Sequence, residues 1–248
     1  FSVYDTDNDG YVDNVFVYYA GYNEAEWGAE NTIWPHRWAV QPGDNYTGTT
    51  ASITFDGKKI FDYACTSELS GSSGSNMAGI GTFTHEFGHV LGLPDFYATD
   101  GAEHHTLNEW SIMDYGPYLN NGKTPPSYNA YERFMLGYIT PTVLNSFGAK
   151  TLKPLNTDNE AFIITQSDTH NLNGLNPNPK EFFILENRQN TGWDTYLPGN
   201  GMLVYRINYD ATKWENNEPN NNPNAMGVDL MEADGIANES TFDGDPFP

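Results

Sequence analysis

The sequence His-Glu-Phe-Gly-His at residues 85–89 constrains this chain more than any other feature. Two histidines four residues apart share one face of an α-helix, where both imidazoles can bind a single metal ion. Gly92 and Pro94 follow, and this pair of residue types ends a helix abruptly. We therefore predict a helix over residues 79–91 that presents both histidines to a zinc ion.

A catalytic zinc site needs three protein ligands and one open position. His85 and His89 supply two of them, and the full spacing His-Glu-x-x-His-x-x-Gly-x-x-Asp makes Asp95 the expected third ligand, after a left-handed exit at Gly92. Glu86 is then the expected general base. Four nearby residues compete with Asp95 for the third position, namely Glu103, His104, His105 and Glu109.

Together these residues resemble the metzincin metallopeptidases, whose long consensus ends in a third His or Asp ligand. The resemblance extends to Ser-Ile-Met-Asp-Tyr-Gly at residues 111–116, which is similar to the methionine turn of that group. It implies that Met113 forms an apolar base beneath the ligand histidines. It also implies a catalytic role for Tyr115, since astacins and serralysins place there a tyrosine that ligates zinc and then contacts the substrate oxyanion. The alternative for Tyr115 is an ordinary core or rim tyrosine.

Within the metzincins, the chain resembles the immune inhibitor A-like peptidases of family M6. Three further segments support this resemblance: an acidic run before the first strand, the loop at residues 33–36, and residues 186–194. The resemblance spans most of the chain, although only residues 85–115 carry motifs specific enough to imply chemistry. It implies a precursor with a prosegment.

Residues 5–13 form a second motif, rich in carboxylates. Aspartates at alternate positions, a glycine at the sixth and an aspartate at the ninth reproduce the start of a calcium-binding loop. The twelfth position holds Phe16 instead of the EF-hand glutamate, and a strand is expected to follow. We expect a structural calcium ion bound by Asp5, Asp7, Asp9, Asp13 and the carbonyl oxygen of Tyr11. A solvated acidic turn is the alternative. The acidic run at residues 229–245 has the same two interpretations, a second calcium site or a solvated charge run, and there we favour the solvated run.

A formal charge of −22 disfavours binding to nucleic acid and to anionic membrane surfaces. No stretch is long and apolar enough for membrane insertion. The single cysteine, Cys65, excludes an internal disulfide and a cysteine-based zinc cluster. Abundant asparagine, glycine, tyrosine and threonine with few lysines is typical of extracellular bacterial hydrolases. We expect a secreted or cell-surface monomer, processed from a longer precursor because no signal peptide is visible.

The fold we expect is α+β. Residues 1–148 would form a metzincin-like catalytic domain with a twisted mixed sheet and the zinc helix, its upper part ending near residue 89 and its lower part covering 90–148. Residues 149–248 would form a β-rich subdomain. The elements expected from hydrophobic patterns and turn residues are a helix over 128–136, strands over 15–20, 161–166, 181–186 and 201–208, and a hairpin of 51–55 and 58–63 around Asp56-Gly57.

These motifs favour a secreted zinc endopeptidase that acts on proteins or peptides. The alternative from another class is a calcium-stabilised, non-catalytic binding or adhesion module that kept a protease-like fold. The intact Glu86 argues against that module. An aminopeptidase would need an acidic anchor for a free amine, and no sequence feature identifies one.

Overall fold

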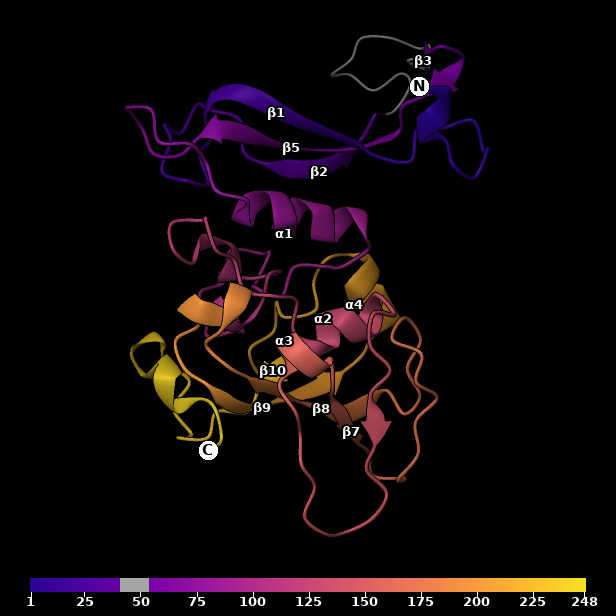
Figure 1. Cartoon of the computed structure of the whole chain (residues 1–248), viewed down its shortest axis with the longest axis vertical. Helices are drawn as coiled ribbons and strands as arrows, with labels where there is room; N and C mark the ends of the chain where they lie inside the picture. The colour runs from indigo at the N-terminus through magenta and orange to yellow at the C-terminus, as the bar shows by residue number, and fades with distance from the viewer. Residues whose placement is uncertain (41–53) are drawn as a thin grey trace. The chain divides into compact units, whose positions relative to one another are not determined.

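The computed structural model describes residues 1–40 and 54–248. These residues form two compact units, Phe1–Val90 and Leu91–Pro248. The chain is a mixed α/β protein, and more of the described residues lie in strands than in α-helices (Figure 1). Residues 51–53 of the expected hairpin lie outside the described residues.

A three-stranded sheet organises the first unit, in the order β1–β5–β2. Strand β5 (Asp62–Leu69) pairs in parallel with β1 (Val15–Tyr22) and antiparallel with β2 (His36–Ala39). The β-branched and aromatic run that predicted a strand over residues 15–20 is thus confirmed within β1. The expected loop at residues 33–36 ends in His36, which is the first residue of β2 and not a loop residue.

The Asp56-Gly57 turn also forms as expected. It joins β3 (Thr54–Phe55) to β4 (Lys58–Lys59) in an antiparallel pair. Both turn residues have positive φ, 50° for Asp56 and 77° for Gly57. Two consecutive residues with positive φ are what a type I′ hairpin turn needs, and Asp-Gly supplies them at low cost.

Helix α1 (Gly81–Val90) lies on one face of this first sheet and contacts β5 and β2 (Figure 1). Thr82 and Glu86, four residues apart, are buried on the same side of the helix. The Thr82 hydroxyl donates a 2.6 Å hydrogen bond to Glu26 Oε1. The helix predicted over residues 79–91 is therefore confirmed, with its ends shortened by two residues and one residue.

The second unit is built on a five-stranded sheet in the order β10–β9–β8–β7–β6. Only the β6–β7 pair is parallel. The strands expected over 161–166, 181–186 and 201–208 are present as β7, β8 and β9. The bounds are β6 (Thr142–Val143), β7 (Phe162–Ile164), β8 (Glu181–Arg188), β9 (Gly201–Asn208) and β10 (Val228–Leu230).

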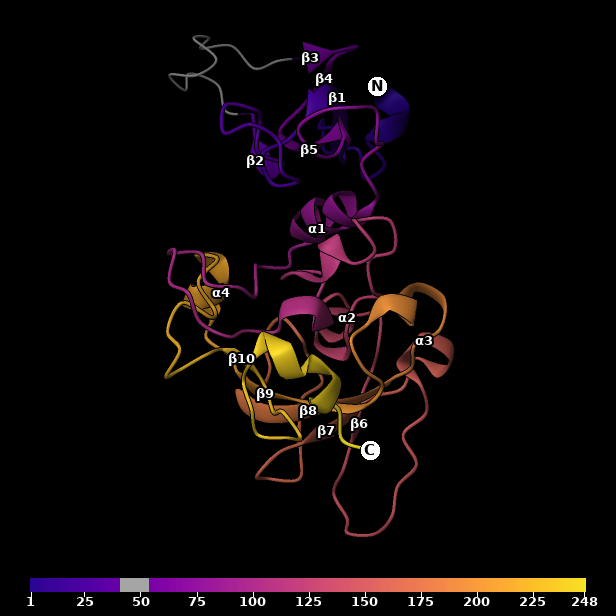
Figure 2. The same cartoon turned by 90° about the vertical axis from the view of Figure 1, so that its left-hand side faces the viewer.

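Three short helices accompany this sheet: α2 (Ala130–Met135), α3 (Leu155–Asp158) and α4 (Ala211–Glu215). Both α2 and α3 contact β8, on the same side of the sheet (Figures 1 and 2). The hydrophobic core of this unit includes the fully buried side chains of Trp110, Tyr131, Phe182 and Tyr205. Strand β6 precedes residue 148 and pairs with β7 after it, and both strands belong to the second compact unit.

None of the helices in residues 1–40 and 54–248 has the length and apolar character needed to cross a membrane.

Asn129 caps α2 and generates a stability prediction. Its buried side chain accepts a hydrogen bond from the Glu132 amide, and Glu132 returns one to the Asn129 amide. Replacing Asn129 by alanine removes this cap and should lower the free energy of unfolding by about 1 kcal/mol or more. Urea unfolding of the metal-free protein measures the loss. Asn129→Ser keeps an acceptor and should lose less; equal stability of wild type and Asn129→Ala would contradict the prediction.

Candidate active site

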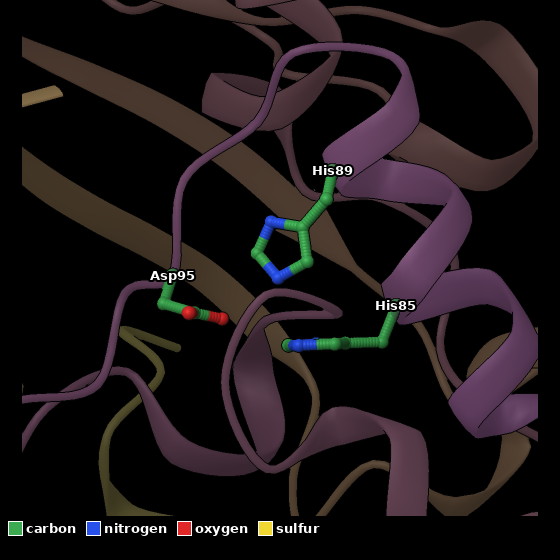
Figure 3. Close-up of side chains that lie close together, drawn as sticks. All are labelled: His85, His89 and Asp95. Carbon is green, nitrogen blue, oxygen red and sulfur yellow. The ribbon is translucent and has the colours of Figure 1, made fainter. Parts of the chain in front are cut away.

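The three expected zinc ligands come together on one continuous segment of chain. Helix α1 carries His85 and His89, whose rings are 4.8 Å apart at their centroids. Gly92 leaves the helix with φ of +99°, a conformation that other residues rarely adopt, and the chain turns back. One ligand atom from each histidine and from Asp95 then lie within 4.8 Å of one another (Figure 3).

This set of atoms fits a zinc ion in its chemistry. Two imidazole nitrogens and a carboxylate oxygen are ordinary zinc ligands, and at bond lengths of about 2.0–2.1 Å tetrahedral ligand atoms are roughly 3.3–3.5 Å apart. The three ligand atoms lie within 4.8 Å of one another, so only small side-chain movements would bring them to bonding distance from one ion. Both histidines are partly exposed and Asp95 is buried.

The four competing residues are arranged differently. His104 Nε2 is 2.8 Å from the carbonyl oxygen of Asn220, and His105 Nε2 is 3.5 Å from Glu232 Oε1. Glu103 is exposed at the surface. Among the residues that the structure describes, neither these three nor Glu109 belongs to the group around His85 and His89.

Glu86 is buried, with 5% of its surface exposed. Its charge influences Tyr19 of β1: burial raises the pKa of the Tyr19 hydroxyl to about 12, with smaller contributions from Cys65, Glu26 and Glu86. Glu86 thus lies in a poorly solvated environment, one residue after a candidate metal ligand.

The expected methionine turn is held firmly in place. Met113 is fully buried, and its amide donates hydrogen bonds to Ser111 Oγ at 3.0 Å and to Glu132 Oε1 at 3.1 Å. Its carbonyl oxygen accepts a 2.7 Å hydrogen bond from the amide of Phe96, the residue after Asp95. The turn is therefore tied directly to the segment that carries the third candidate ligand.

Gly116 closes this turn by a close approach of the backbone. A Cβ atom at this position would lie 2.3 Å from the carbonyl oxygen of Ser111, so only glycine fits. Tyr115, just before it, is 57% exposed. Together with His104 and His105, it lines an open cavity of about 590 Å³ in the second unit.

Glu132 is a residue that sequence reasoning missed. Its carboxylate accepts hydrogen bonds from Ser111 Oγ at 2.6 Å and from the amides of Met113 and Asn129. It therefore joins the cap of α2 to Ser111 and Met113. The Asn-x-x-Glu pattern at residues 129–132 signals a capping box in the sequence, but nothing in that pattern indicates the contact with Met113.

The acidic residues near the N-terminus converge in part. Ligand atoms of Asp5, Asp7 and Asp13 lie within 4.8 Å of one another. Asp9 is outside this group, and its carboxylate accepts a 2.8 Å hydrogen bond from the Tyr11 amide. Buried Asp5 forms an ion pair with Lys58 and accepts a hydrogen bond from its ammonium group. This hydrogen bond lowers the pKa of Asp5.

The first part of the chain is similar to known proteins. Residues 4–137 match the family model described as immune inhibitor A peptidase M6, catalytic domain. The chain is 34% identical over 134 residues to immune inhibitor A of Bacillus thuringiensis subsp. alesti, covering 50% of this chain and 18% of that protein. It is 28% identical over 137 residues to the pre-pro-metalloprotease PrtV of Vibrio cholerae serotype O1 (strain M66-2), covering 52% of this chain and 14% of that protein. The chain thus spans less than a fifth of the length of these relatives.

Asp114, next to Met113, generates a prediction about pH. Burial raises the pKa of its carboxyl group to about 6. Hydrogen bonds from Thr106 and Asn108 lower this pKa in part, and the negative charge of Asp95 raises it further. An ordinary aspartate has a pKa of about 3.9, so between these values the folded state holds a proton that the unfolded state has released. This contribution to stability is fully present below about pH 4 and is lost as the pH rises through 6.

Urea unfolding of the metal-free protein at pH 5 and pH 7.5 tests this contribution. The contribution of Asp114 is present at pH 5 and lost at pH 7.5. The free energy of unfolding at pH 5 minus that at pH 7.5 should therefore be smaller by about 1 kcal/mol in Asp114→Asn than in the wild type. The variant Asp168→Asn, which removes the same charge from an exposed position, should leave the difference unchanged. An unaltered difference in Asp114→Asn would show that this carboxyl group does not titrate as expected.

Proposed function

The chain belongs to the immune inhibitor A peptidase family, M6, and from this premise we propose that it is a zinc-dependent endopeptidase that hydrolyses peptide bonds in proteins. The observation that carries the proposal is the convergence of His85, His89 and Asp95 after the bend at Gly92. A family model restricted to the catalytic domain, matching residues 4–137, supports it further.

The roles follow from the chemistry of each side chain. His85, His89 and Asp95 would hold the zinc ion. When bound, zinc lowers the pKa of a water molecule toward about 7 and polarises a carbonyl group. Glu86 would accept a proton from the attacking water and deliver it to the leaving amine.

Two residues of the methionine turn complete the proposed site. Met113 would form the apolar base beneath the histidines. The Tyr115 hydroxyl would donate a hydrogen bond to the oxyanion that develops on the scissile carbonyl. The exposure of Tyr115 is compatible with a side chain that meets substrate.

We further propose a metzincin-like arrangement, in which residues 1–148 act as the catalytic domain and residues 149–248 as a β-rich subdomain. An extended substrate would pair with an edge strand of the first sheet, the usual mode of strand addition. One relative is named a pre-pro-metalloprotease, and we propose that this chain likewise derives from a precursor, is secreted and acts as a monomer. Its charge of −22 argues against nucleic-acid partners.

We also propose a structural calcium ion at residues 5–13, held by Asp5, Asp7 and Asp13 and completed by Asp9 and the Tyr11 carbonyl. Three carboxylates this close repel one another unless a cation lies among them. Lys58 supplies one positive charge to Asp5, and the remaining carboxylates are exposed to solvent ions.

Substitution of Glu86 tests the enzymatic proposal. Glu86→Ala and Glu86→Gln should bind zinc as the wild type does, because neither variant removes a proposed ligand. Both should lose at least 100-fold in kcat for cleavage of an unfolded protein substrate, because the proton acceptor is gone. Peptide products are followed by mass spectrometry and bound zinc by elemental analysis.

The matched control is Glu30→Ala, which removes an exposed glutamate of the same unit and should cleave at the wild-type rate. Equal cleavage by wild type and both Glu86 variants would refute the mechanism. Zinc binding by the wild type with no hydrolysis of any protein or peptide would favour the non-catalytic binding module.

Calcium titration tests the second proposed site. Calcium added to the chelator-treated protein should raise the Tm, because an ion that binds only the folded state stabilises it by mass action. Asp7→Ala removes the side-chain oxygen and should abolish most of this increase, whereas Glu30→Ala, an exposed control, should preserve it. An equal rise in wild type and Asp7→Ala would contradict a site at residues 5–13.

A further inference from the structure

Asp95 forms two hydrogen bonds with one side chain, Asn217, which lies 122 positions further along the sequence. The amide of Asp95 donates a 2.7 Å hydrogen bond to Asn217 Oδ1, and Asn217 Nδ2 donates a 2.7 Å hydrogen bond to Asp95 Oδ2. The two bonds form a closed ring, so the carboxamide contacts both the backbone and the carboxylate of one residue. Such a ring restricts the rotation of the Asp95 side chain.

Asn217 belongs to an asparagine-rich segment, residues 216–222, that follows α4. Further bonds connect this asparagine segment to the chain after Asp95. Asn220 is fully buried and its Nδ2 bonds to the Phe96 carbonyl at 2.8 Å. Asn221 Oδ1 accepts a 2.8 Å hydrogen bond from the Thr99 amide, and the Thr99 hydroxyl donates to the Asn217 carbonyl at 2.7 Å.

The backbone at Asn217 explains why an asparagine suits this position. Its φ of 60° lies in the left-handed region, which asparagine tolerates better than most residues. The carboxamide carries both a donor and an acceptor, as the ring with Asp95 requires. An aspartate here would oppose one carboxylate to another, and an alanine would lose both hydrogen bonds.

We propose that Asn217 is a positioning residue for the zinc site, which orients the Asp95 carboxylate toward the metal held with His85 and His89. This inference rests on the proposed function. Partners that hold a metal ligand in this way typically contribute 10- to 100-fold in metal affinity. The asparagine segment lies beyond residues 4–137, the part that matches the catalytic-domain model, so the zinc site depends on chain outside that match.

The test compares zinc affinity and ligand geometry in purified variants. Asn217→Gly removes the carboxamide without strain at positive φ, and Asn217→Asp keeps the acceptor but places a charge beside Asp95. Asn221→Ala is the matched control, because it loses hydrogen bonds to Thr99 but none to Asp95. Zinc dissociation constants come from competition with a chromophoric chelator, and the geometry from the visible absorption spectrum of the cobalt-substituted protein.

Both Asn217 variants should bind zinc about 10- to 100-fold more weakly than wild type, with an altered cobalt spectrum. Asn221→Ala should keep the wild-type spectrum and affinity, even if its Tm falls. Wild-type affinity and an unchanged spectrum in Asn217→Gly would overturn the inference while leaving the protease proposal intact. If the wild type itself bound no zinc, both would fall together. Circular dichroism of the metal-free variants separates loss of fold from loss of zinc; if one variant is unfolded, the other decides.

Discussion

The reversal of the chain between His89 and Asp95 is the constraint on which the proposed site depends. A helix can bring two histidines to one ion, but it cannot supply a third ligand from the same face without ending. Gly92 ends α1 with φ of +99° and lets Asp95 return within reach. A buried carboxylate in that position must be held by partners, because its desolvation is costly.

Residues 95–99 form hydrogen bonds with several other parts of the chain. The Met113 carbonyl oxygen accepts a hydrogen bond from the Phe96 amide, and the Met113 amide donates one to Glu132 at the start of α2. On another side, Asn217 and Asn220 bind Asp95 and Phe96 through side-chain amides. The carboxamide of Asn217 is neutral, so it orients the Asp95 carboxylate without neutralising the charge that a metal ion requires.

Local patterns predicted much of this arrangement. The helix over 79–91, the strand over 15–20 and the Asp56-Gly57 turn depend on neighbouring residues, and all three form as expected. Asn217 could not be found in this way, since its partner is 122 residues distant and an asparagine-rich stretch predicts only a loop. The ion pair between Asp5 and Lys58 of β4 also could not be predicted, because the alternation of aspartates gives no information on which distant residues lie nearby.

A crystal structure of the zinc-loaded protein, with an anomalous difference map at the zinc absorption edge, tests the central claim most directly. We predict one strong peak at about 2.0–2.2 Å from a nitrogen of His85, a nitrogen of His89 and an oxygen of Asp95. Asn217 should retain its hydrogen bond to the same carboxylate. A peak bound by His104 or His105, or an Asp95 side chain turned away from the ion, would contradict it.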